Sequence, residues 1–88
     1  MKVVCLYRED TDYAREVTDW MHEFERETGK RIEVLDPDSV DGDIFTRAHD
    51  ILQFPMVVAL TNDGVVHKKW GGTPLPQFDE VLYYLKDI

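Results

Sequence analysis

The most informative segment of the chain is Phe54-Pro55-Met56-Val57-Val58-Ala59-Leu60, in which a proline directly precedes five consecutive apolar residues. A short, continuous apolar run of this kind is typical of a strand that is buried on both faces of its sheet. Proline has no backbone N–H to donate, and within sheets it is tolerated at the first residue of a strand. We therefore predict a central strand over residues 56–60 that is opened by Pro55.

Further strand and turn patterns lie on both sides of this segment. The turn Thr61–Gly64 ends in Asp-Gly, a dipeptide typical of hairpins, so residues 65–70 are predicted to return as an antiparallel strand. Three of its residues are charged or ionisable, as suits the edge of a sheet: His67, Lys68 and Lys69. Near the N-terminus, Val3–Tyr7 is a second apolar run and is predicted as another central strand. A short strand is predicted over residues 32–35, ending at Asp36-Pro37.

Apolar residues at helical spacing predict three helices. The first is expected to begin at an N-cap formed by Asp10 or Thr11 and to end at Thr28-Gly29. Its apolar stripe is Tyr13, Val17, Trp20, Met21 and Phe24. A short helix is expected after a capping turn at residues 41–43, with the stripe Ile44, Phe45, Ala48, Ile51 and Leu52. The last helix has the stripe Phe78, Val81, Leu82, Leu85 and Ile88.

The predicted order β-α-β-α-β-β-α defines an α/β architecture. A right-handed crossover should make the first two strands parallel, and the hairpin should make the last two antiparallel. We expect a four-stranded mixed sheet in the order second, first, third, fourth strand, with helices on both faces. The first and last helices should share one face and the short helix should cover the other. The buried sheet residues are then expected to include Val3, Cys5, Val57 and Ala59.

Composition limits the classes of function. The chain has 88 residues, enough for one domain, 1–88, with one core. Its 18 acidic and 10 basic side chains give a formal net charge of −8, which argues against nucleic acid and anionic membranes as partners. Its single cysteine suits a reducing compartment, and the apolar run that follows Lys2 is too short for a signal peptide. We expect a monomeric protein of the cytoplasm.

The element order, with Pro55 immediately before the third strand, resembles the thioredoxin superfamily. The short length and the opening strand make it most similar to the glutaredoxin-like branch. Three local features carry the resemblance: residues 8–14, where the family has a loop and Cys-Pro-Tyr-Cys, Phe54-Pro55-Met56, where it has a cis-proline, and Trp70-Gly71-Gly72, where it has a glycine pair. The resemblance covers essentially the whole chain and implies a thioredoxin-like fold with a cis Phe54–Pro55 bond.

The chain departs from this family at the residues that perform its reaction. The two motif cysteines fall on Thr11 and Ala14, and of the motif's inner residues only Tyr13 is kept. Thiol–disulfide exchange needs a thiolate, which neither threonine nor alanine can supply. Cys5 lies within an apolar run, where a small buried core residue with a raised pKa is expected. We therefore expect a protein that is not a redox enzyme.

The resemblance implies a groove at the family's active edge, and we predict that it binds a protein or an extended peptide. The residues placed there are Arg8, Thr11, Asp12, Tyr13, Ala14, Phe54, Pro55, Gly71, Gly72 and Thr73. Backbone pairing and aromatic contacts would provide the binding. The nearby carboxylates of Glu9, Asp10 and Asp12 favour a basic segment. No cofactor is expected.

Three alternatives stay open. One is an enzyme, either glutathione-binding or a thiol-dependent oxidoreductase of the glutaredoxin-like type that uses Cys5 or a ligand's thiol. For glutathione, Thr73-Pro74 replaces the acidic residues that usually follow the family's glycine pair. Another is an assembly subunit in which the fold serves only as a scaffold. The last concerns Trp70, which either seals the sheet or belongs to a binding surface. No metal site is predicted, because the acidic run 36–43 fails the calcium-loop pattern.

Overall fold

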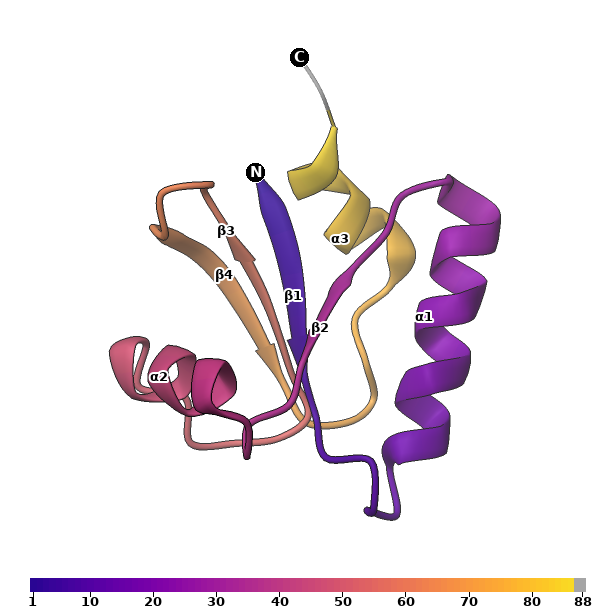
Figure 1. Ribbon diagram of the computed structural model, residues 1–88. Coiled ribbons are helices and arrows are strands. Elements are labelled where there is room, and N and C mark those ends of the chain that lie inside the picture. The colour runs from indigo at the N-terminus through magenta and orange to yellow at the C-terminus, as the bar shows by residue number, and fades with distance from the viewer. Residues whose placement is uncertain (87–88) are drawn as a thin grey trace.

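The computed structural model describes residues 1–86, and its seven elements follow the predicted order (Figure 1). They are β1 (Lys2–Leu6), α1 (Ala14–Thr28), β2 (Glu33–Leu35), α2 (Val40–Ala48), β3 (Met56–Leu60), β4 (Val66–Gly71) and α3 (Phe78–Leu85). No helix within this described part of the chain is long and apolar enough to cross a membrane.

The sheet has the predicted strand order, β2-β1-β3-β4. β1 pairs in parallel with β2 and antiparallel with β3, and β3 pairs antiparallel with β4. β1 and β3 therefore occupy the centre, which explains their continuous apolar sequences: every residue of β3 is buried. β4 lies at an edge, where residues 67–69 are exposed as its charged sequence predicts.

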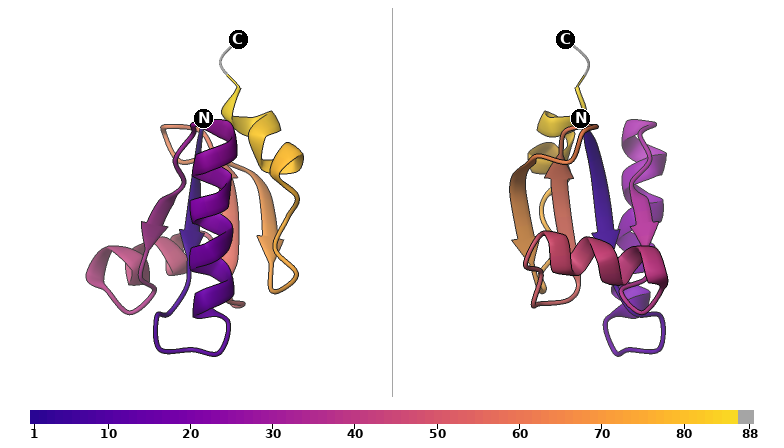
Figure 2. Two further views of the ribbon diagram at one scale, coloured as in Figure 1. Left: turned by 90° about the vertical axis from the view of Figure 1, so that its right-hand side faces the viewer. Right: turned by 60° about the vertical axis from the view of Figure 1, so that its left-hand side comes forward.

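The helices form two layers around the sheet, again as predicted. α1 and α3 cover one face and α2 covers the other (Figures 1 and 2). On the first face, Val17 and Phe24 of α1 and Val81 of α3 pack on alternate sheet residues. These sheet residues include the four that the sequence predicts to be buried: Val3, Cys5, Val57 and Ala59. The second face buries a separate cluster that contains Leu6, Val58 and Ile51.

The first helix begins later than predicted. Its N-cap is Tyr13, not Asp10 or Thr11, and its first residue is Ala14. The Thr11 hydroxyl instead donates to the Arg8 carbonyl at 2.7 Å, and the Thr11 carbonyl accepts from the Ala14 N–H at 3.2 Å. These two bonds hold residues 8–14 in a turn that precedes the helix. The helix ends as predicted, at Gly29, whose φ of 71° suits glycine.

The short helix differs most from the prediction. α2 begins at Val40, after Ser39, whose hydroxyl accepts from the Gly42 N–H, and ends at Ala48, before Ile51. Two residues of the predicted apolar stripe are exposed, Ile44 by 60% and Leu52 by 92%. Because the helix already begins at Val40, Gly42 lies inside it and not in a capping turn.

Other boundaries shift by about one residue. Tyr7 lies just beyond β1, Ile32 just before β2, and the last strand runs from Val66 to Gly71. α3 begins with a capping box between Gln77 and Glu80. The predicted stripe position at Ile88 lies outside the described residues.

Candidate functional site

One edge of the sheet gathers the segments that the sequence places in a groove. β1 and β4 end and β3 begins at this edge, which lies at the bottom of Figure 1. The Phe54–Pro55 peptide bond is cis, and so is Thr73–Pro74. The Gly72 N–H donates to the Pro55 carbonyl at 2.8 Å. The glycine pair and the proline segment, which are far apart in sequence, are therefore in direct contact.

Arg8 connects the loop before α1 to the same edge. Its guanidinium carbon lies 4.7 Å from the centre of the Phe54 ring, and its Nε lies 3.0 Å from Oδ2 of Asp38. The hydrogen bond that the guanidinium donates to Asp38 raises the pKa of Arg8. Sequence reasoning missed Asp38, which it treated as part of a solvated turn. Because Asp38 follows β2, it reaches this edge only through the parallel pairing of β1 with β2.

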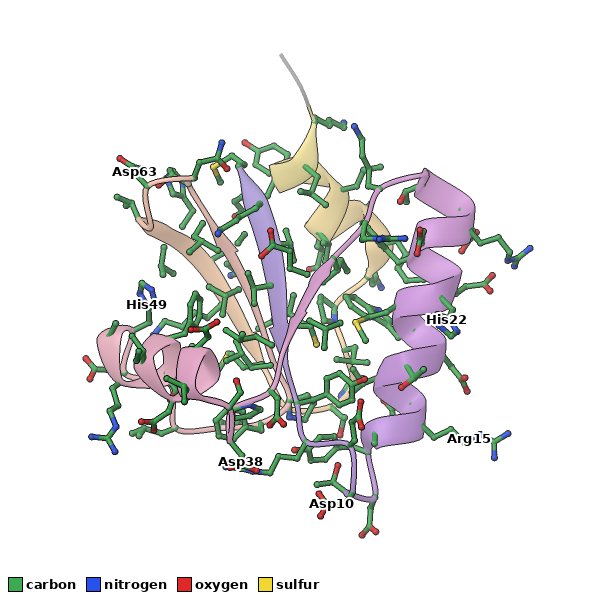
Figure 3. The ribbon with its side chains drawn as sticks, viewed as in Figure 1. Asp10, Arg15, His22, Asp38, His49 and Asp63 are labelled. Atoms are coloured by element: carbon green, nitrogen blue, oxygen red, sulfur yellow. The ribbon has the colours of Figure 1, made fainter. Side chains whose placement is uncertain are left out.

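The remaining loop residues divide into packed and exposed ones. Tyr13 and Ala14 are half-buried and pack against the core on the α1 side. The carboxylates of Glu9, Asp10 and Asp12 belong to exposed residues. Figure 3 shows Asp10 in the loop before α1 and Asp38 at the same end of the molecule. The edge therefore presents acidic side chains beside a limited area of the Tyr13 ring.

A second side chain that the sequence did not predict covers the glycine pair. A Cβ at Gly71 would lie 2.5 Å from Oε1 of Gln53, and a Cβ at Gly72 would lie 2.7 Å from its Nε2. The amide of Gln53 therefore occupies the space that the missing glycine side chains leave open. Thr73 is exposed beside it.

Comparison with known proteins finds similarity in fold alone. No protein-family model and no curated protein matches the sequence. The structure of thioredoxin 1 from the thermophilic eubacterium Thermosipho africanus TCF52B matches with a TM-score of 0.66 at 14% identity, over 97% of this chain and 90% of that one. This chain has a thioredoxin-like fold. A structure described as that of a malarial protein matches with a TM-score of 0.65 at 14% identity, over 94% and 90% of the two chains.

The single cysteine of the chain, Cys5, lies in the core of this thioredoxin-like fold. Cys5 is fully buried between β2 and β3, where it pairs with Val34 and Val57. Burial raises the pKa of its thiol from 9.0 to about 12. A thiol that stays protonated and inaccessible is a poor nucleophile. Cys5 therefore belongs to the core of the sheet, as its apolar neighbours predict.

Trp70 is half-buried and turns toward α3. Its ring meets that of Tyr84 edge to face at 5.6 Å, and it packs against the core on the α1 and α3 side. Trp70 therefore packs against the core with part of its ring and leaves the rest exposed. Within residues 1–86 no cluster of three or more His, Cys, Asp or Glu side chains could hold a metal ion.

Proposed function

We propose that this chain is a redox-inactive, glutaredoxin-like protein that binds a protein or an extended peptide at the edge described above. By resemblance, Thr11 and Ala14 occupy the positions of the two motif cysteines. Neither side chain can form a disulfide, and Cys5 is buried. The fold is thus retained without the groups that its redox reaction needs.

The observation that supports the binding role is that the backbone N–H and carbonyl of Phe54, next to the proline, are unpaired within the described part of the chain. Among residues 1–86, neither the N–H nor the carbonyl of Phe54 has a hydrogen-bond partner, although Pro55 beside it is paired with Gly72. An extended segment can pair with such groups in the manner of an added strand. The exposed part of the Phe54 ring would contribute aromatic contact. Gln53, which is exposed, would move aside as the segment approaches Gly71.

Charge at the edge favours a basic segment. Glu9, Asp10 and Asp12 are exposed, and Arg8 of the same loop is already paired with Asp38. These carboxylates would repel an anionic ligand such as glutathione. The Arg8 guanidinium would attract it only weakly, because Asp38 already accepts its hydrogen bond. This argument favours a basic peptide over the glutathione-binding alternative.

The first test measures redox chemistry. In insulin-reduction and mixed-disulfide reductase assays, with and without glutathione, we expect no turnover above a control without protein. The reason is that the only thiol is buried and protonated. Turnover that disappears in a Cys5→Ser variant would instead establish the thiol-dependent enzyme.

The second test measures the contribution of the acidic loop. An acetylated hexapeptide that alternates valine and lysine should bind about 5- to 10-fold more weakly to the triple variant Glu9→Gln, Asp10→Asn, Asp12→Asn, since each exposed charge contributes only modestly. Binding to the native protein should also weaken as salt is raised.

The matched control removes three other exposed carboxylates, with Asp19→Asn, Glu27→Gln and Asp50→Asn. It has the same net charge as the loop variant and should lose much less affinity. Equal losses in the two variants would mean that net charge, and not this edge, attracts the peptide.

We also propose that the protein acts as a monomer in the cytoplasm. The alternative is a subunit whose fold serves only as a scaffold in a larger assembly. Light scattering over a concentration series distinguishes the two, because a monomer keeps a mass of 10.3 kDa at every concentration.

A further inference from the structure

A groove runs along the outer edge of the sheet, on the side opposite α2. Three hollows, of about 380, 260 and 450 Å³, follow one another along β4. The first and second share Tyr83 and Tyr84, and the second and third share Trp70 and Glu80. We call this surface the β4–α3 groove. In Figure 2 β4 lies at the sheet edge, with the connection to α3 beside it.

The backbone of β4 is unpaired along this groove. β4 is the last strand in the order β2-β1-β3-β4, and within residues 1–86 it pairs only with β3. Its outer N–H and carbonyl groups are therefore open to another extended chain. The α3 side offers apolar surface next to them, since Tyr83 is 69% exposed and Trp70 is half-buried.

The charge of the groove is opposite to that of the protein as a whole. The net charge is −8, yet His67 and Lys86 line the first hollow and Lys68 lines the second. The exposed Lys69 lies outside the groove on the α2 side, where its Nζ donates to the His49 carbonyl at 3.0 Å. Among the described residues 1–86, Glu80 supplies the carboxylate of the lining, and it accepts the Gln77 N–H at 3.1 Å in the cap of α3. An extended segment in this groove therefore meets mainly positive charge.

We infer that the β4–α3 groove binds an acidic, extended segment of another protein, which adds a fifth strand beside β4. Lys68 and Trp70 line the groove together, so side chains on the facing side of the added strand reach both. An acidic residue opposite Lys68 and an apolar residue opposite Trp70 give the best match. A second copy of β4 is a poor occupant because its lysines would face the same lysines.

This surface is separate from the edge of the proposed function and has the opposite charge preference. The proposed function uses an acidic loop and Phe54 to bind basic peptides, whereas the β4–α3 groove uses lysines and α3 to bind acidic ones. Either can fail without the other.

The test uses an acetylated, amidated peptide of sequence Val-Thr-Glu-Glu-Val-Thr-Val and a control peptide with two lysines in place of the glutamates. With the acidic peptide, we expect amide shifts over residues 66–70 and at Tyr83 and Tyr84, together with new hydrogen-exchange protection in β4. The control peptide should leave these amides unchanged.

Charge reversal provides the matched variants. The pair Lys68→Glu, Lys86→Glu should bind the acidic peptide about tenfold more weakly. The pair Arg15→Glu, Arg47→Glu changes the net charge equally, at exposed sites on α1 and α2, and should lose much less. The triple variant of the acidic loop should keep its affinity for the acidic peptide.

Three results would overturn this inference. The first is the absence of shifts in β4 and α3. The second is an equal loss of affinity in the two charge-reversed pairs. The third is binding without new protection of β4 amides, because an added strand must pair with them.

Discussion

Cys5 in the native protein at pH 8 should react with a thiol reagent at least about 1000-fold more slowly than in denaturant. Only the thiolate reacts, and burial raises the pKa of this thiol from 9.0 to about 12, which lowers the thiolate fraction by about three orders of magnitude. Full burial of the side chain slows the reaction further. A native rate equal to the denatured rate would show that Cys5 is not in the core.

The same pKa shift predicts how stability depends on pH. The raised pKa means that the folded state holds the thiol proton more tightly than the unfolded state. The resulting stabilisation is fully present below pH 9 and is lost as the pH rises from 9 toward 12, by about 1.4 kcal/mol per pH unit. Urea unfolding of the native protein and of Cys5→Ala over this range measures the difference. A constant difference would contradict the assigned shift.

Phe24→Ala should lower the free energy of unfolding by about 3–5 kcal/mol. The ring is fully buried and joins two helices, with the Trp20 ring of α1 at 6.0 Å and the Phe78 ring of α3 at 5.4 Å. Truncation leaves a cavity between α1, α3 and the sheet. Urea unfolding followed by circular dichroism measures the loss.

The exposed aromatic residue Tyr83 provides the control. Tyr83→Ala should change the free energy of unfolding by about 0.5 kcal/mol or less, since the side chain is 69% exposed. If Phe24→Ala is too unstable to study, Phe24→Leu should give a smaller loss of the same sign. A loss below about 1 kcal/mol for Phe24→Ala would mean that this cluster does not hold the two helices together.

The topology was predictable because it rests on strong periodic signals. The apolar runs at 3–7 and 56–60 require strands buried on both faces, so they had to be central. The charges at 67–69 then placed the last strand at an edge. None of these inferences depends on where an element begins.

The start of α2 was misplaced because the Asp-Gly-Asp run was given more weight than Ser39, which is the N-cap of this helix. A Cβ on Gly42 would lie 1.7 Å from the Asp36 carbonyl oxygen, so the helix packs against that backbone only with glycine at this position. In sequence, the same glycine between two aspartates is typical of a turn. The glycine is required by this close approach to the preceding segment, and the serine cap fixes where the helix begins.

The candidate site was predicted as a set of segments, but not as a set of contacts. The sequence placed Arg8, Phe54 and the glycine pair together, and the structure brings them to one edge. It did not identify Asp38 or Gln53, whose roles depend on neighbouring strands and loops. An exposed polar residue in a loop has no periodicity, so no local signal marks its partner.

The central claim is that this thioredoxin-like fold recognises a basic extended segment at an edge that has no redox thiol. The most direct test is an amide titration of isotope-labelled protein with the valine–lysine hexapeptide and, separately, with glutathione. We predict that the peptide shifts residues 11–14, 54–56 and 71–73 in a salt-dependent way, and that glutathione moves them little. Tight binding of glutathione at these residues, with no response to the peptide, would contradict the claim.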